Sequence, residues 1–138
     1  GMDAGQKLEV HELLARAAYG YDARDLDVLT ACFAPDARMV IRIADQATVG
    51  PFVGREAVMG LMRQSIETQT DVRRHVITNL FFEKCGGTSA RVVSDLSLFA
   101  TERGQARLLC TGVYRDEVVH MGGRWVIADR DLHLDGAY

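Results

Sequence analysis

The chain lacks the features that mark membrane, secreted and nucleic-acid-binding proteins. No apolar run approaches the roughly 20 residues of a membrane-spanning helix. Near its start the sequence also lacks the charged segment followed by an apolar one that is typical of a secretory signal. Lysine and arginine are scattered, and the net charge is only −3. The nearest basic cluster, Arg73–Arg74, is far too small for a nucleic-acid footprint. We therefore expect a cytoplasmic protein that binds neither nucleic acid nor a membrane.

Cysteine is also scarce, and its pattern argues against disulfides and metal sites. The three cysteines, Cys32, Cys85 and Cys110, are odd in number and widely spaced, with no CxxC pair. Reduced and mostly buried thiols are the expected state. The segment 50–54 contains glycine and proline but lacks the lysine of a phosphate-binding loop. We expect no metal and no cofactor.

The composition that remains is that of an ordinary globular protein. Hydrophobic residues make up 48% of the chain and charged residues 25%, and 138 residues are the usual size of one domain. No internal repeat, low-complexity segment or linker interrupts the sequence. Gly1 precedes Met2 and is expected to be the remnant of a removed tag. We expect a single domain over residues 1–138.

The apolar pattern changes period along the chain. Helical spacing predicts helices over 6–22 and 55–69, and Asp25 can cap a short helix that ends before Pro35. A first strand is expected at 37–43, followed by a loop around 50–54. From residue 73 the period is two, and glycine turns separate strands expected at 73–84, 89–102, 106–119 and 124–135. The pattern predicts an α+β fold with helices packed on one face of a curved sheet.

The last expected strand carries acidic residues and a histidine on one alternating face, namely Asp129, Asp131, His133 and Asp135. Carboxylates and imidazole are suitable metal ligands. However, residues two apart on a strand lie about 7 Å from one another, so three of them share one ion poorly. A solvated strand face is the better interpretation.

The candidate functional residues are an aspartate and a histidine far apart in the sequence. Asp22 ends the first expected helix, and His75 opens an apolar strand. Asp22 could instead be an exposed helix end, and His75 a satisfied histidine buried in the sheet. If they meet, the carboxylate orients the ring and makes a general acid/base dyad. Alternation puts His75, Ile77, Asn79 and Phe81 on one face, so His75 and Asn79 are expected to line a pocket.

Several short motifs resemble the SnoaL-like superfamily, which shares the cone-shaped fold of nuclear transport factor 2. The matching stretches are YDARDLD at 21–27, FAPDA at 33–37, GREA at 54–57, HVITN at 75–79, GVYRD at 112–116 and GRWVI at 123–127. The resemblance implies a curved antiparallel sheet with three N-terminal helices packed on it. Because this fold hosts enzymes, binding modules and accessory subunits, it implies no single reaction.

Within the superfamily the chain most resembles scytalone dehydratase. In that enzyme a Tyr-Asp pair on the first helix and a histidine opening a later strand share one pocket, and these positions fall on Tyr21, Asp22 and His75. The resemblance implies that Asp22 orients His75, which abstracts a proton beside a carbonyl. The hydroxyl of Tyr21 would hold a substrate oxygen.

Three positions depart from the scytalone dehydratase pattern. Ile41 stands where a water-holding tyrosine is found, Ala100 lies near the position of a second catalytic histidine, and Tyr114 near that of a pocket asparagine. These departures remove the leaving-group machinery and leave the proton-abstraction half of the reaction.

Two classes of function are consistent with the sequence. The first is a cofactor-independent lyase or isomerase that acts on a small apolar molecule, cyclic or carbonyl-containing. Its pocket would be lined by Asn79, Tyr114, Phe81, Leu98, Ala100, Leu108, Cys110 and Ile41. The second is a non-catalytic ligand-binding module, or an assembly protein like the β subunits of ring-hydroxylating dioxygenases, which share this fold. In both cases Val93, Val113 and Val119 on the outer sheet face predict a homodimer or homotrimer.

Overall fold

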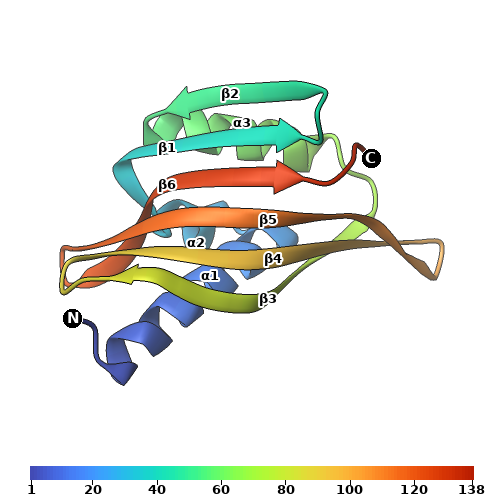
Figure 1. The fold of residues 1–138 in the computed structure, drawn as a ribbon. Helices are drawn as coiled ribbons and strands as arrows, with labels where there is room; N and C mark the ends of the chain where they lie inside the picture. Colours follow the sequence, from blue (N-terminus) through green and yellow to red (C-terminus); the bar gives the residue numbers. More distant parts are fainter.

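The computed structural model, which describes residues 1–138, has three helices packed against one face of a six-stranded sheet (Figure 1). The strand order across the sheet is β2-β1-β6-β5-β4-β3. In chain order the elements are α1 (Ala4–Asp22), α2 (Leu26–Ala31), β1 (Phe33–Ile43), β2 (Ala47–Val53), α3 (Arg55–Glu67), β3 (Val72–Cys85), β4 (Ser89–Glu102), β5 (Gln105–Met121) and β6 (Arg124–Leu134).

The expected architecture needs three corrections. The sheet is mixed rather than antiparallel, because β1 lies parallel to β6. Helix α3 follows β1 and β2, so only α1 and α2 precede the sheet. The segment around 50–54, expected to be a loop, belongs largely to the edge strand β2, which pairs only with β1. A strand with a single neighbour tolerates proline, which explains why Pro51 can lie within it.

Helices α1 and α2 begin at capped positions and meet closely where α1 ends. Asp3 and Gln6 form a capping box at the start of α1, and the carboxylate of Asp25 accepts from the backbone N–H of Val28 in α2. A Cβ at Gly20 would lie 3.0 Å from the backbone nitrogen of Leu29, so glycine permits this approach. None of the helices is long and apolar enough to cross a membrane.

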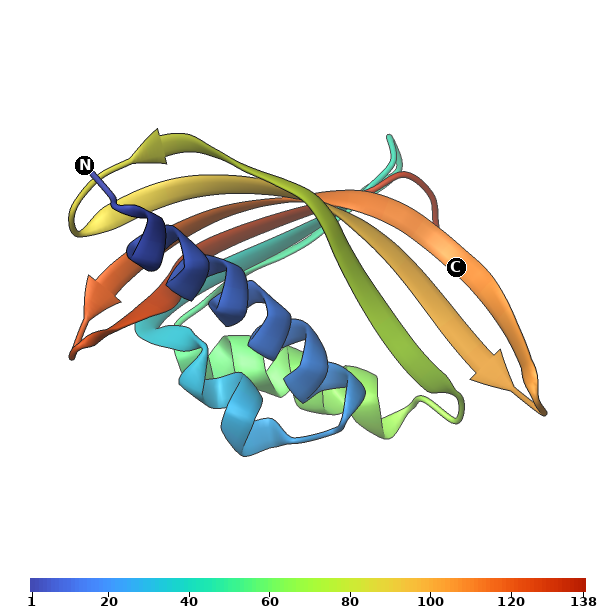
Figure 2. The same cartoon turned by 90° about the horizontal axis from the view of Figure 1, so that it is seen from below.

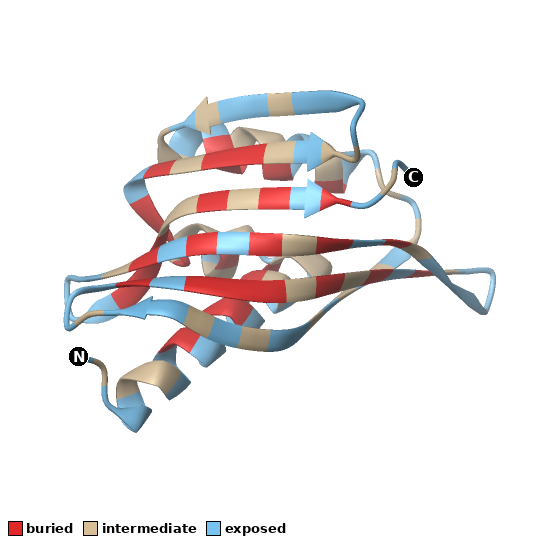
Figure 3. Ribbon diagram, in the orientation of Figure 1, coloured by how far each residue is buried: buried red, intermediate tan, exposed pale blue.

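The sheet curves around the helices, and its concave face and the helices enclose the core (Figure 2). The main core cluster has 17 buried residues and joins the helices to the sheet. A second cluster of six lies on the sheet alone and consists of Leu96, Leu98, Cys110, Tyr114, Leu132 and Leu134. The edge strands β2 and β3 contain no buried residue, whereas the four inner strands alternate between buried and exposed positions (Figure 3).

Candidate functional site

A cavity of about 100 Å³ lies between the helices and the sheet. Its walls come from both helical and strand residues and are mostly apolar, including Leu14, Ala17, Met39, Leu61 and Met62. Six side chains with polar groups also line it, namely Tyr21, Ser65, His75, Tyr114, Arg130 and Tyr138. This volume has room for several water molecules or one small organic molecule. An apolar cavity with a few polar groups is the usual form of a small-molecule site.

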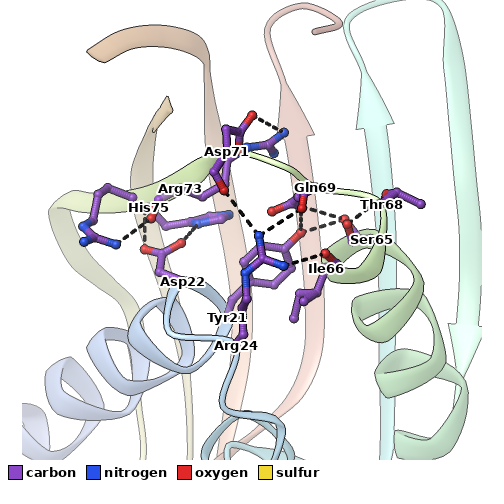
Figure 4. A network of polar contacts seen from close by, with 11 residues as sticks. Tyr21, Asp22, Arg24, Ser65, Ile66, Thr68, Gln69, Asp71, Arg73 and His75 are labelled. Atoms are coloured by element: carbon purple, nitrogen blue, oxygen red, sulfur yellow. Dashed lines mark hydrogen bonds and ion pairs between the residues drawn. The ribbon is translucent and has the colours of Figure 1, made fainter. Parts of the chain in front are cut away.

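Asp22 and His75 meet beside this cavity, and Figure 4 shows their contact. Oδ1 of Asp22 lies 2.6 Å from Nδ1 of His75, and Oδ2 accepts the backbone N–H of the same histidine at 2.7 Å. The two side chains are only 9% and 14% exposed. His75 lines the cavity whereas Asp22 lies behind it. Because a carboxylate only accepts hydrogen bonds, Nδ1 donates its hydrogen and Nε2 is left as the basic ring nitrogen.

Tyr21 connects this histidine to helix α3. Its ring packs edge-on against His75, with ring centroids 4.8 Å apart and an interplanar angle of 65°. Its hydroxyl lies 2.6 Å from Oγ of Ser65 and accepts a hydrogen bond from the side-chain amide of Gln69 (Figure 4). When the tyrosine donates to Ser65, the Ser65 hydroxyl keeps its own hydrogen for a group in the cavity.

Arg24 fixes the end of α1 to the segment that leads into β3. Its guanidinium donates to the backbone carbonyls of Ile66, Gln69 and Asp71 at 3.0–3.3 Å (Figure 4). Asp71 in turn accepts from Arg73 at 2.7 Å. These contacts hold the first residues of β3 against the end of α1, and so they set the position of His75 relative to Asp22.

A buried ion pair lies elsewhere on the cavity wall. Nε of Arg130 donates to Oδ1 of Asp116 at 2.8 Å, and Nη2 donates to Oδ2 at 3.1 Å. The guanidinium lies over the ring of Tyr114, 4.1 Å from its centroid. Burial raises the pKa of the Asp116 carboxyl, although Arg130 opposes this shift. Burial acts to lower the pKa of Arg130, but Asp116 and Tyr114 outweigh it, so the guanidinium stays charged.

Only some of the other expected pocket residues line the cavity. Ile41 and Tyr114 line the cavity, but Asn79 and Phe81 do not. Asn79 adopts φ +54°, and the pairing of β3 with β4 shifts register between Thr78 and Phe81. This bulge reverses the alternation, so Phe81 is 54% exposed and Asn79 donates to Asp95 at 2.8 Å instead.

A second bulge explains the placement of Leu108. The pairing of β4 with β5 shifts register after Leu98 and Cys110, so Leu108 lies opposite Phe99 on the outer face and is 53% exposed. Leu98 and Cys110 lie on the inner face but pack in the smaller core cluster. Ala100 is also buried, and none of these residues lines the cavity.

The acidic face of β6 is occupied by ion pairs and local hydrogen bonds. Asp129 lies 3.6 Å from Arg38, and Asp131 lies 3.2 Å from Arg42, both on the neighbouring strand β1. Asp135 accepts from the hydroxyl of Thr111 at 2.6 Å. No group of three or more histidine, cysteine, aspartate or glutamate side chains is arranged to hold a metal ion.

Ser65, Arg130 and Tyr138 are the polar cavity residues that sequence reasoning missed. Ser65 and Arg130 carry a recognisable signal, because each is a polar residue at an apolar position. Ser65 belongs to the stripe of α3 that contains the buried Met62. Arg130 lies between Asp129 and Asp131 and therefore shares the inner face of β6 with Leu132.

Comparison with known proteins identifies the family. The family model of the SnoaL-like domain matches residues 3–131. Among solved structures, a provisionally named scytalone dehydratase from Novosphingobium aromaticivorans is 22% identical with a TM-score of 0.75, over 93% of this chain and 83% of that chain. A protein from Catenulispora acidiphila in complex with S-DNPA is 23% identical with a TM-score of 0.81, over 96% of both chains.

A third structure, a protein of unknown function with a cystatin-like fold from Nostoc punctiforme, is 22% identical with a TM-score of 0.80. The match covers 97% of this chain and 94% of that chain. Identities this low show the fold alone. A comparison with curated proteins found no match. The family match spans nearly the whole sequence, and on that basis the chain belongs to the SnoaL-like domain family, with the fold of nuclear transport factor 2-like proteins.

Proposed function

We propose that this protein is a cofactor-independent enzyme of the lyase or isomerase type that acts on a small, apolar, cyclic molecule with a carbonyl group. The observation that carries the proposal is the two-point contact between Asp22 and His75 beside an apolar cavity. A histidine held by a carboxylate on one ring nitrogen has its second nitrogen available as a general base.

In this mechanism Nε2 of His75 takes a proton from the carbon beside the carbonyl. Asp22 stabilises the imidazolium that forms, and its bond to the backbone N–H keeps the ring in place. The hydroxyls of Tyr21 and Ser65 are bonded to each other, and the one whose hydrogen is not used in that bond donates it to the carbonyl oxygen as negative charge develops there. When a carbon–carbon double bond lies next to that carbon, removal of the proton gives a dienol. Return of the proton to the far end of the dienol shifts the double bond into conjugation with the carbonyl and gives an isomer.

Ile41 supports isomerisation over dehydration. It lines the cavity at the position where the resemblance to scytalone dehydratase implies a water-holding tyrosine, and it has no hydroxyl. Arg130, another polar residue of the cavity wall, is already bonded to Asp116. General base catalysis by His75 would contribute roughly 10²- to 10⁴-fold to the rate.

Proton exchange in heavy water tests this proposal. The protein is incubated with a series of cyclic ketones, and loss of the α-proton signal is followed by NMR. The parent should exchange at least one of them, and His75→Gln should slow it by roughly 10²- to 10⁴-fold. His133→Gln, which changes an exposed histidine on β6, is the matched control and should have no effect.

The alternative is a non-catalytic ligand-binding module or an assembly protein. In that case the contact between Asp22 and His75 is a structural bond that joins α1 to the sheet. A folded protein that binds cyclic ketones but exchanges none of them faster than buffer would favour this alternative.

We further propose that the protein forms a homodimer or homotrimer in the cytoplasm. Of the valines expected on the outer sheet face, Val93 is buried and Val113 and Val119 are half-buried. The exposed apolar side chains of that face include Val72, Val76, Phe81, Phe99 and Leu108, on β3, β4 and β5. A second copy of the chain is the partner that would cover them.

A further inference from the structure

The buried guanidinium of Arg130 has one nitrogen, Nη1, that donates no hydrogen bond to the protein. Its side chain is only 8% exposed, and Nε and Nη2 are both bonded to Asp116. The protein supplies no hydrogen-bond acceptor to Nη1. Nη1 is not fully enclosed by protein atoms, so a water-sized molecule can reach it. Because Arg130 lines the cavity, a molecule bound in the cavity can accept a hydrogen bond from Nη1.

The ion pair is costly as a purely structural feature. The free-energy cost of removing two charges from water is offset only when the geometry of the pair is good and the remaining donors are also hydrogen-bonded. The contact of Asp116 with Nε and Nη2 satisfies two of the five N–H donors of the guanidinium, and the ring of Tyr114 covers its face. The donors on Nη1 remain, and a buried donor without an acceptor costs about 1–3 kcal/mol.

Arg130 and His75 serve different parts of the cavity. His75 pairs with Leu98 and through it with Cys110, whereas Arg130 pairs with Asp116, six residues further along β5. The cavity residues of α1 run from Leu14 to Tyr21, which corresponds to about 10 Å of helix. A molecule that reaches both groups therefore has polar atoms at two ends and an apolar body between them.

We propose that Nη1 of Arg130 binds a neutral oxygen acceptor of the ligand, such as a ketone carbonyl, away from the group that faces His75. Asp116 and Tyr114 are positioning residues that fix the guanidinium. Because the carboxylate of Asp116 already neutralises the charge, the site offers donors without net positive charge. It therefore favours a neutral carbonyl over a carboxylate, whose burial would leave an uncompensated charge. This assignment rests on the proposed small-molecule function of the cavity.

Binding of three ligands of matched shape tests the proposal without relying on catalysis. The ligands are acetophenone, ethylbenzene and benzoate, and their affinities are measured by isothermal titration calorimetry. The parent should bind the ketone about tenfold more tightly than the hydrocarbon, which is the ratio that one good hydrogen bond supplies. It should bind the carboxylate more weakly than the ketone.

Two variants identify the group responsible. Asp116→Leu combined with Arg130→Met replaces the pair by apolar side chains and leaves no buried charge, so it is expected to fold. Arg130→Lys keeps the charge opposite Asp116 but has no planar second donor. Both should bind the ketone and the hydrocarbon equally. His75→Gln should keep the tenfold ratio, which separates this site from the proton-transfer site.

The proposal is overturned if either folded Arg130 variant keeps the parent ratio. Tighter binding of benzoate than of the ketone would overturn the preference for a neutral oxygen, and so would the absence of any ketone binding by the parent. The proposed reaction has a separate test, because proton exchange that depends on His75 can fail while the ligand ratio at Arg130 holds.

Discussion

At the scale of single residues, Asp22 decides which ring nitrogen of His75 carries the hydrogen. The backbone N–H of His75 is a fixed donor to Oδ2, and Nδ1 donates to Oδ1. An asparagine has only one acceptor, which the backbone N–H would occupy. Its amide NH₂ would then face Nδ1, which can accept only if the ring hydrogen moves to Nε2. Asp22→Asn should therefore remove the free basic nitrogen from the cavity.

Long-range ¹H–¹⁵N correlation NMR measures this tautomer directly. The neutral ring of His75 should carry its hydrogen on Nδ1 in the parent and on Nε2 in Asp22→Asn, and proton exchange should fall at least tenfold. The exposed His133 provides an internal reference that should not change. An unchanged tautomer of His75 in the variant would remove Asp22 from the mechanism.

Tyr114 gives the folded protein a dependence on alkaline pH. Burial raises its pKa from 10.0 to about 12. Because the folded state holds the phenol proton more tightly, this contribution to stability is complete below pH 10 and is lost as the pH rises towards 12. Between pH 9 and pH 11 the free energy of unfolding should fall by about 1.4 kcal/mol on account of Tyr114.

Urea denaturation at the two pH values checks this prediction. Tyr114→Phe keeps the ring over which Arg130 lies but has no phenol proton, so its stability should fall less over this interval. The difference between the two proteins isolates Tyr114 from other groups that titrate in the same range. Equal losses in parent and variant would show that Tyr114 has an ordinary pKa.

At the scale of elements, period and capping predict where the helices and strands lie, but not where strands bulge. The strand expected at 89–102 is β4 residue for residue, and the helix expected at 6–22 is α1 within two residues. A bulge adds one residue to a strand without changing its apolar composition. The alternation of inward and outward side chains therefore fails beyond the bulge. For this reason the sequence pattern predicts Asn79 and Phe81 in the cavity although neither lines it.

The sequence pattern and the family resemblance together predict the pairing of Asp22 with His75, but neither predicts the pairing of Arg130 with Asp116. Partners on different strands depend on register, and the sequence carries no signal for the meeting of Asp116 and Arg130. The parallel pairing of β1 with β6 is likewise a long-range choice that local periodicity does not encode. What the sequence does contain is a charged residue on an apolar strand face.

The bulge at Asn79 can be tested by its backbone conformation. Its φ of +54° lies in the left-handed region, which β-branched residues rarely adopt. Asn79→Val should lower the free energy of unfolding by about 1–2 kcal/mol. Asn79→Gly is the matched control and should change it by less than about 1 kcal/mol, since glycine adopts this conformation without strain. Urea denaturation of both variants measures the difference, and equal effects would mean that strain at this bulge is negligible.

At the scale of the whole molecule, the convex face of the sheet determines whether the protein associates with itself. Helices cover only the concave face (Figure 2), and the opposite face of β3, β4 and β5 carries the exposed side chains of Val76, Phe81, Phe99 and Leu108. Register places all four on the same side of the sheet. An apolar surface shared by three neighbouring strands is a typical self-association surface, because association removes it from water.

Light scattering coupled to size-exclusion chromatography should therefore find a dimer or trimer of the 15.2 kDa chain at micromolar concentration. Phe81→Lys combined with Leu108→Lys should shift it to the monomer, because lysines at opposite ends of the surface would be buried against a second copy. Leu8→Lys is the matched control, since Leu8 is 68% exposed on α1, away from the sheet face. A parent that is monomeric at these concentrations, or a double variant that keeps the parent mass, would place the interface elsewhere or show that there is none. Because the two lysines face away from the cavity, ketone binding by the monomeric variant would further show that one chain forms the complete site.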